Sequence, residues 1–131
     1  MLLVAASALQ DNEHEARATR LRTAGAELIN LPGAKGQVDL PALLAHLAQR
    51  GVNELHVEAG AQLNGALART GLVDEWLVYV APRLLGTGRG VLAGPPLVDL
   101  AQSLDLRHGA CEPVGDDLRL RLFQRQGFNR V

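Results

Sequence analysis

Cysteine pairs, long apolar runs and an excess of charge of one sign are all missing from this 131-residue chain. Cys111 is the only cysteine, which excludes an internal disulfide and a cysteine-based zinc cluster and fits a reducing cytoplasm. No run approaches the roughly 18 apolar residues of a membrane span. The 13 basic and 14 acidic residues are mixed along the chain and form no basic face for nucleic acid or membrane. We therefore expect a soluble, cytoplasmic protein that binds neither.

Two families of catalytic motif are also missing from the sequence. There is no Gly-x-Ser-x-Gly elbow of the hydrolases and no His/Glu spacing of a metal site, so we predict no metal ligands. The length suits one domain with a hydrophobic core of its own.

The apolar residues alternate between short runs and longer amphipathic segments. The short runs predict strands at residues 2–6, 27–31, 55–57 and 76–80. Between them, capping residues and closing glycines predict helices from residue 13 to 23, from 40 to Gly51 and from 61 to Gly71. This order indicates an α/β domain of parallel strands covered by helices, with 76–80 as a central strand.

The C-terminal part follows a different pattern. Two alternating runs, at residues 104–113 and 118–123, flank Gly115-Asp116-Asp117 and predict an antiparallel hairpin. The polar residues 124–131 that follow predict a frayed tail. We therefore expect a domain over residues 1–123 and a tail over 124–131.

The stretch from residue 55 to 67 carries the strongest indication of a site. Gly60 is the expected turn between a strand and a helix, where unpaired backbone N–H groups and the helix dipole favour a phosphate. Glu58 lies at the carboxyl end of that strand, where ligands bind in open α/β sheets. The alternative is a surface acid beside an ordinary turn.

The glycine-rich segment 86–90 contains Arg89 and is a second, weaker phosphate candidate. It neither follows a predicted strand directly nor opens a helix, as a dinucleotide fingerprint requires. We favour a mobile connection at the mouth of a site.

Four segments together resemble one known family. They are V-E-A-G-A-Q-L-N-G-A-L at 57–67, G-L-V-D-E at 71–75, Y-V-A-P-R-L-L-G at 79–86 and V-G-D-D-L-R-L at 114–120. In order and spacing they resemble the reductase domain of the bifunctional riboflavin-biosynthesis deaminase/reductases, the RibD family. The resemblance covers the chain up to residue 123.

The resemblance implies a fold like that of dihydrofolate reductase: a mixed sheet with flanking helices and a C-terminal antiparallel hairpin. It implies hydride transfer from NADPH to C1′ of 5-amino-6-(5-phosphoribosylamino)uracil, giving the ribitylamino product of riboflavin biosynthesis. Glu58 matches the family's substrate-binding acid, and we assign it the catalytic role. The family's NADP-binding loop and helix start match Gly60, Ala61, Gln62, Leu63, Asn64, Gly65 and Ala66.

The family's domain begins well upstream of the segment that Met1 matches, so we expect a partial domain that lacks its N-terminal strands. An exposed sheet edge promotes pairing between chains, so we expect a homo-oligomer or a poorly stable chain. Two other functions remain open: a truncated nucleotide-binding or dimerisation module without activity, and a dihydrofolate-reductase-like reductase of another pyrimidine or a pterin.

Overall fold

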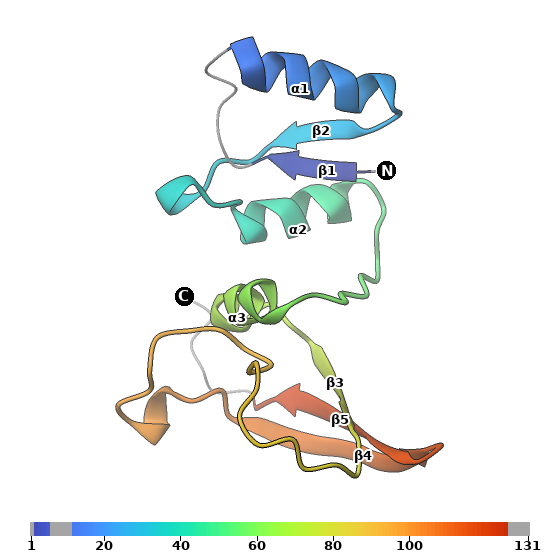
Figure 1. The fold of residues 1–131 in the computed structure, drawn as a ribbon, viewed down its shortest axis with the longest axis vertical. Coiled ribbons are helices and arrows are strands. Elements are labelled where there is room, and N and C mark those ends of the chain that lie inside the picture. The colour runs from blue at the N-terminus through green and yellow to red at the C-terminus, as the bar shows by residue number, and fades with distance from the viewer. Residues whose placement is uncertain (1, 6–11, 126–131) are drawn as a thin grey trace. The chain divides into compact units, whose positions relative to one another are not determined.

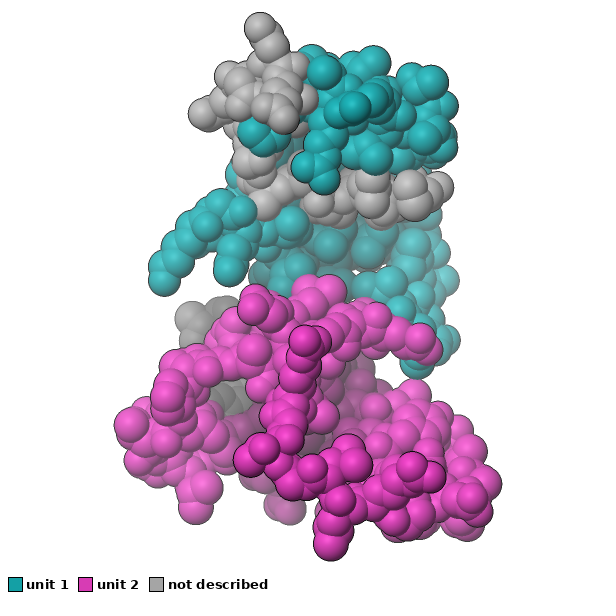
Figure 2. Space-filling view, viewed as in Figure 1, with its two compact units in different colours: residues 1–56 teal, residues 57–131 magenta. Residues whose placement is uncertain are grey.

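The computed structural model describes residues 2–5 and 12–125, whose elements are labelled in Figure 1. Backbone contacts divide the chain into two compact units, residues 1–56 and residues 57–131, which Figure 2 distinguishes by colour. Each unit has a sheet of its own. The α-helices of the described ranges are too short and too polar for a bilayer crossing.

The first unit is built on a strand–helix–strand crossover. Strands β1 (Leu2–Ala5) and β2 (Glu27–Asn30) pair in parallel, and α1 (Asn12–Thr23) connects them. Parallel neighbours need such a crossover, because a tight turn joins only antiparallel strands. These elements confirm the strands predicted near residues 2–6 and 27–31 and the helix predicted over residues 13–23. The sequence also indicates Asp11 as the cap of that helix, and Asp11 lies outside the described residues.

Helix α2 (Leu40–Gln49) begins as its sequence predicts. The Asp39 carboxylate accepts a hydrogen bond of 2.9 Å from the Ala42 N–H, and a proline occupies the first turn, where its missing N–H costs nothing. Gly51 follows the helix with a φ of +84°, the left-handed conformation that suits glycine. Upstream of this helix, Ala34–Gly36 forms the short 3₁₀ helix η1.

The second unit contains helix α3 and an antiparallel sheet. Helix α3 (Ala61–Thr70) runs from Gly60 to the left-handed Gly71, as predicted. Strands β3 (Glu75–Val80), β4 (Leu106–Val114) and β5 (Asp117–Gln124) form a sheet of order β3-β5-β4, and η2 (Leu100–Gln102) precedes β4. The predicted hairpin is therefore confirmed as β4 and β5.

Alternation along the three strands separates an apolar face from a charged one. Trp76 is opposite Leu122 and Val78 is opposite Leu120, whereas the intervening positions carry ion pairs. On that second face Arg121 binds both carboxylate oxygens of Glu75, and Arg119 binds Glu112 at 2.7 Å. Arg107 lies over the Phe123 ring.

The predicted strand at residues 55–57 is wrong. Residues 52–60 have no regular secondary structure and join no ladder among the described residues, and the Leu55 and Val57 side chains are 49% and 40% exposed. A segment as short as Leu55-His56-Val57 does not determine a β conformation by itself, because strand formation depends on partner strands and packing.

The predicted single parallel sheet and the central position of β3 are wrong as well. The described strands form one parallel pair and one antiparallel sheet, in which β3 lies at an edge and β5 at the centre. The apolar content of β3 indicates burial but does not specify its partner, and the alternating strand β5 supplies that partner. The mixed α/β class with a C-terminal antiparallel hairpin is nevertheless confirmed.

The hydrophobic core of the described residues is small. Its buried apolar side chains are Ala18, Ala26 and Leu67, and several large apolar side chains of the second unit are exposed, such as Leu84 and Val98. Folding of the described residues therefore removes little surface of large apolar side chains from water. Burial of such surface is the main contribution that stabilises a folded protein. The expected low stability or oligomerisation of the chain stays a prediction.

Candidate functional site

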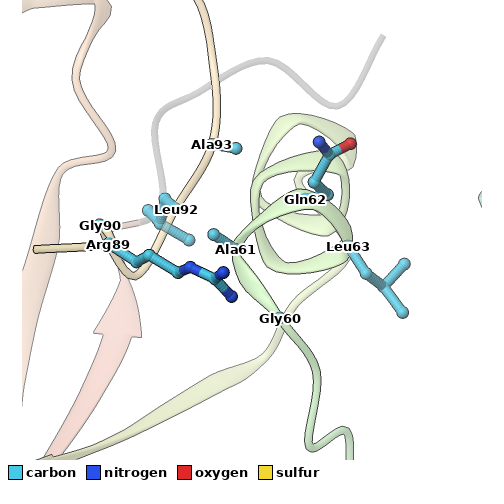
Figure 3. A pocket seen from close by; sticks show the side chains of 8 residues that line it. All are labelled: Gly60, Ala61, Gln62, Leu63, Arg89, Gly90, Leu92 and Ala93. Carbon is cyan, nitrogen blue, oxygen red and sulfur yellow. The ribbon is translucent and has the colours of Figure 1, made fainter.

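A pocket of about 610 Å³ lies at the start of α3, entirely within the second unit. One wall comes from the first turn of the helix and the other from the loop that follows β3 (Figure 3). Its lining residues are Gly60, Ala61, Gln62, Leu63, Arg89, Gly90, Leu92 and Ala93. The glycine turn and the glycine-rich loop of the sequence thus meet at one pocket.

The helix presents backbone donors to this pocket. Gly60 is the N-cap residue in an extended conformation and has no side chain to accept a hydrogen bond from the first turn. The first helical bond runs from the Asn64 N–H to the Gly60 carbonyl at 3.1 Å, so the N–H groups before it have no intrahelical partner. Their partial positive charge, together with the helix dipole, attracts an anion.

Three hydrogen bonds fasten the opposite wall to α3. The Ala93 N–H donates to the Ala61 carbonyl at 2.8 Å, and Arg69 Nη1 donates to the Ala93 carbonyl at 3.0 Å. The Asn64 side-chain amide donates to the Val91 carbonyl at 3.3 Å and also to the Ala59 carbonyl at 3.1 Å. The loop therefore has a fixed position next to the helix start.

Gly65 permits this close approach. It is buried in α3, and a Cβ added to it would overlap the backbone of Ala93. Since backbone atoms of a bonded loop cannot give way cheaply, any larger residue at this position would push the loop off the helix. The second glycine of the sequence motif thus serves packing between helix and loop.

The seven residues predicted to bind the cofactor separate into three groups in the structure. Gly60, Ala61, Gln62 and Leu63 line the pocket, whereas Asn64 and Gly65 hold the loop. Ala66 is half-buried and lies outside the lining.

Glu58 is exposed, lies two residues before Gly60 and does not belong to the pocket lining. Its assigned catalytic and substrate-binding role stays a prediction.

For the loop side of the pocket, the sequence indicates only a weaker phosphate candidate, segment 86–90, which we interpreted as a mobile connection at the mouth of a site. Arg89 and Gly90 of that segment line the pocket. The glycine and arginine content of that segment was the available signal. The sequence contains no comparable signal for Leu92 and Ala93, because their position depends on contacts with a helix more than twenty residues earlier.

Arg89 is the only charged residue of the lining. The resolved pKa shifts belong to the charged face of the sheet, where hydrogen bonds from Arg121 lower the pKa of the Glu75 carboxyl. Within residues 2–5 and 12–125, His, Cys, Asp and Glu side chains form no group of three that could hold a metal ion. The chemistry available at the pocket is therefore binding of an anionic group by backbone N–H donors and one guanidinium.

Fold and pocket together define an α/β protein with a pocket at a helix start whose backbone donors suit an anion. The family model of the RibD C-terminal domain matches residues 2–120, which includes both units. The chain belongs to the RibD C-terminal domain family.

Relatives with curated names agree with this membership. The riboflavin biosynthesis protein RibD of Escherichia coli is 42% identical over 93 residues, which is 70% of this chain and 25% of that protein. A 5-amino-6-(5-phosphoribosylamino)uracil reductase of Buchnera aphidicola is 30% identical over 66% of this chain and 42% of its own length. The chain thus spans about a quarter of the RibD proteins it matches.

A solved structure extends the similarity to three dimensions. Acinetobacter baumannii RibD superposes with a TM-score of 0.70 at 30% identity, covering 82% of this chain and 29% of that one. A second form of the same protein gives a TM-score of 0.68. The neighbours carry the dihydrofolate-reductase-like fold that the sequence motifs implied.

Proposed function

We propose that this chain is an NADPH-dependent reductase of riboflavin biosynthesis that acts on 5-amino-6-(5-phosphoribosylamino)uracil. The observation that carries the proposal is the match to the RibD C-terminal domain over residues 2–120. It is supported by the relative whose name states this activity, and by the pocket formed where the family motif begins.

The residues at the start of α3 suit the phosphates of a dinucleotide. Their backbone N–H groups have no capping side chain to satisfy them, and small residues let a ligand approach the backbone. The chemistry that bound NADPH would supply is the hydride for reduction of C1′ of the ribosyl group. The protein contributes position and charge, which is the usual division of labour between a protein and its cofactor.

Glu58 is the residue that we assign to the substrate. Its carboxylate accepts hydrogen bonds from the hydroxyls or the amine of the ribosylamino group, which orients C1′ toward the cofactor. Replacing Glu58 by Gln keeps the size of the side chain and removes its charge. We expect turnover to fall in this variant while NADPH binding stays unchanged.

A cytoplasmic homo-oligomer is the form that we propose for the active protein. The single cysteine fits a reducing compartment, and the small core fits a chain that gains stability from a second copy. Sedimentation at several protein concentrations tests the oligomer, and a monomer throughout would contradict it.

The decisive experiment combines binding and turnover. NADPH affinity is measured by fluorescence titration, and turnover by NADPH consumption with the phosphoribosylamino substrate. Gly60→Val is the informative variant, because Gly60 has a φ of −78° and an added Cβ would meet no atom within 4 Å, so we expect the variant to fold. We expect weaker NADPH binding with an unchanged circular dichroism spectrum, and unchanged affinity would contradict the assignment.

Two alternative functions have observations in their favour. Glu58 lies outside the pocket lining, and the lining contains no carboxylate or histidine that could serve as a general acid or base, which favours nucleotide binding without turnover. A Methanothermobacter thermautotrophicus relative, 33% identical over 63% of this chain, is named as a 2,5-diamino-6-ribosylamino-4(3H)-pyrimidinone 5′-phosphate reductase, which favours a related pyrimidine as substrate. Binding without turnover identifies the first alternative, and faster turnover of the diaminopyrimidinone identifies the second.

A further inference from the structure

Arg89 extends from the loop after β3 toward the first turn of α3. Figure 3 shows its side chain directed at Ala61 and Gly60, where the backbone donors of the helix begin. It is the only charged side chain among the eight residues that line the pocket. A cation therefore faces a helix end that itself carries partial positive charge, an arrangement that is stabilised when an anion lies between them.

Most arginines of the second unit already have partners. Arg119 and Arg121 bind carboxylates across the sheet, Arg125 pairs with Asp105, Arg107 lies over Phe123, and Arg69 binds a backbone carbonyl. Within the described residues Arg89 makes neither an ion pair nor a hydrogen bond. Its five N–H donors are therefore available to a ligand.

The loop that carries Arg89 has a fixed position a few residues further on. Val91 and Ala93 are hydrogen-bonded to α3, and Ala93 packs directly on Gly65. These contacts place the base of the arginine side chain beside the helix start before any ligand arrives. Less conformational entropy is lost on binding when the receptor is ordered in advance, which strengthens binding.

We propose that Arg89 binds the diphosphate of the nicotinamide dinucleotide, opposite the backbone N–H groups at the start of α3. This inference rests on the proposed function, which supplies the dinucleotide. Guanidinium and phosphate form charge-assisted, often bidentate hydrogen bonds, and the helix start supplies the donors on the other side of the group. The diphosphate is common to NADPH and NADH, so Arg89 strengthens binding of both and leaves the preference between them unchanged.

The test is a set of fluorescence titrations of the 131-residue chain with NADPH and with NADH at low and moderate ionic strength. Arg89→Gln removes the charge and is expected to weaken both nucleotides about tenfold, in line with the loss of one charge-assisted contact. The affinity of this variant should also fall less steeply with rising salt concentration, because salt then screens one ionic contact fewer than in the wild type. Arg89→Lys keeps the charge without the planar fork and should restore part of the affinity.

Arg83→Gln is the matched control. Arg83 lies in the same loop region, is exposed and makes no ion pair within the described residues, but it does not line the pocket. We expect wild-type affinity and salt dependence from this variant. An equal loss in the Arg83 and Arg89 variants would mean that only general surface charge matters and would overturn the proposal.

Two further outcomes would overturn the inference while the proposed function stands. Unchanged affinity of Arg89→Gln for both nucleotides would show that the arginine does not contact the ligand. A loss confined to NADPH would assign Arg89 to the 2′-phosphate in place of the diphosphate. If the folded wild-type chain binds neither nucleotide, the proposed function itself fails, which is a different result from a failure of Arg89.

Discussion

Helices α2 and α3 have the same length but begin in opposite ways. The first turn of α2 is capped by the residue before it, since the Asp39 carboxylate accepts a hydrogen bond from the Ala42 N–H. The first turn of α3 follows Gly60, which has no side chain to do this, and it opens into a pocket lined by Arg89. In α2 a side chain of the protein thus accepts a hydrogen bond from a first-turn N–H group, whereas in α3 the first-turn N–H groups remain accessible from the pocket.

This difference shows how a helix start is assigned to stability or to binding. An N-cap side chain stabilises a helix by about 1 kcal/mol and also occupies the place where an anion would bind. Glycine gives up part of that stabilisation and leaves the donors accessible. A variant that adds a capping side chain to α3 should therefore raise the stability of the helix and lower the affinity for NADPH.

The largest effect should come from Gly65→Ala, which breaks the α3 arrangement by displacing its loop. The added Cβ would overlap the Ala93 backbone, and overpacking of this kind costs about 1–3 kcal/mol. We expect a lower urea midpoint together with weaker NADPH binding. Gly88→Ala is the control, because its Cβ meets nothing within 4 Å, and equal losses in both variants would contradict the packing role of Gly65.

Next in size is Gly60→Asp, which gives α3 the start that α2 has. Gly60 already has the extended conformation of an N-cap residue, so an aspartate can accept from the first turn. The helix should gain a few tenths of a kcal/mol, while the new negative charge repels phosphate and lowers NADPH affinity by about tenfold or more. Tighter NADPH binding in this variant would contradict the proposal that the uncapped start of α3 binds phosphate.

A smaller effect is expected from Asp39→Ala, which removes the cap of α2. The loss of one N-cap side chain should lower the free energy of unfolding by about 1 kcal/mol. NADPH affinity, measured on the folded variant, should stay at the wild-type value. If it falls as far as in Gly60→Asp, the contrast between the two helix starts is wrong.

The smallest effect concerns a pair outside both helix starts. Hydrogen bonds from Arg121 lower the pKa of Glu75 below its ordinary value, so the pair stabilises the folded state above the usual carboxyl pKa of about 4.3. This contribution is lost as the pH falls through the lowered folded-state pKa. Glu75→Gln should reduce the acid-side loss of stability in pH-dependent urea melts, and an identical pH profile would show that the exposed pair contributes nothing.

Local signals predicted the helices and the hairpin well. These signals act within a few residues, so they can be recognised in the sequence. They are the Asp39 cap, the glycines that end α2 and α3, and the alternation of residues in β4 and β5. The strand at 55–57 and the central place of β3 were wrong, because strand pairing depends on segments far along the chain.

The sequence indicated the two walls of the pocket with unequal strength. The motif at residues 57–67 located the helix wall through Gly60, whereas the loop wall with Arg89 depends on hydrogen bonds between α3 and residues 91–93. Asn64 hydrogen-bonds to that loop and Gly65 packs against it, and their predicted contact with the cofactor stays a prediction. Sequence spacing alone cannot separate residues that line a pocket from residues that build its wall.

The most direct test of the account is an NADPH titration of the wild-type chain beside Gly60→Asp, with circular dichroism to verify that both are folded. We expect saturable binding to the wild type and an affinity lower by about tenfold or more in the variant. Equal affinities, or no saturable binding by a folded wild-type chain, would contradict the claim that the open start of α3 binds a nucleotide.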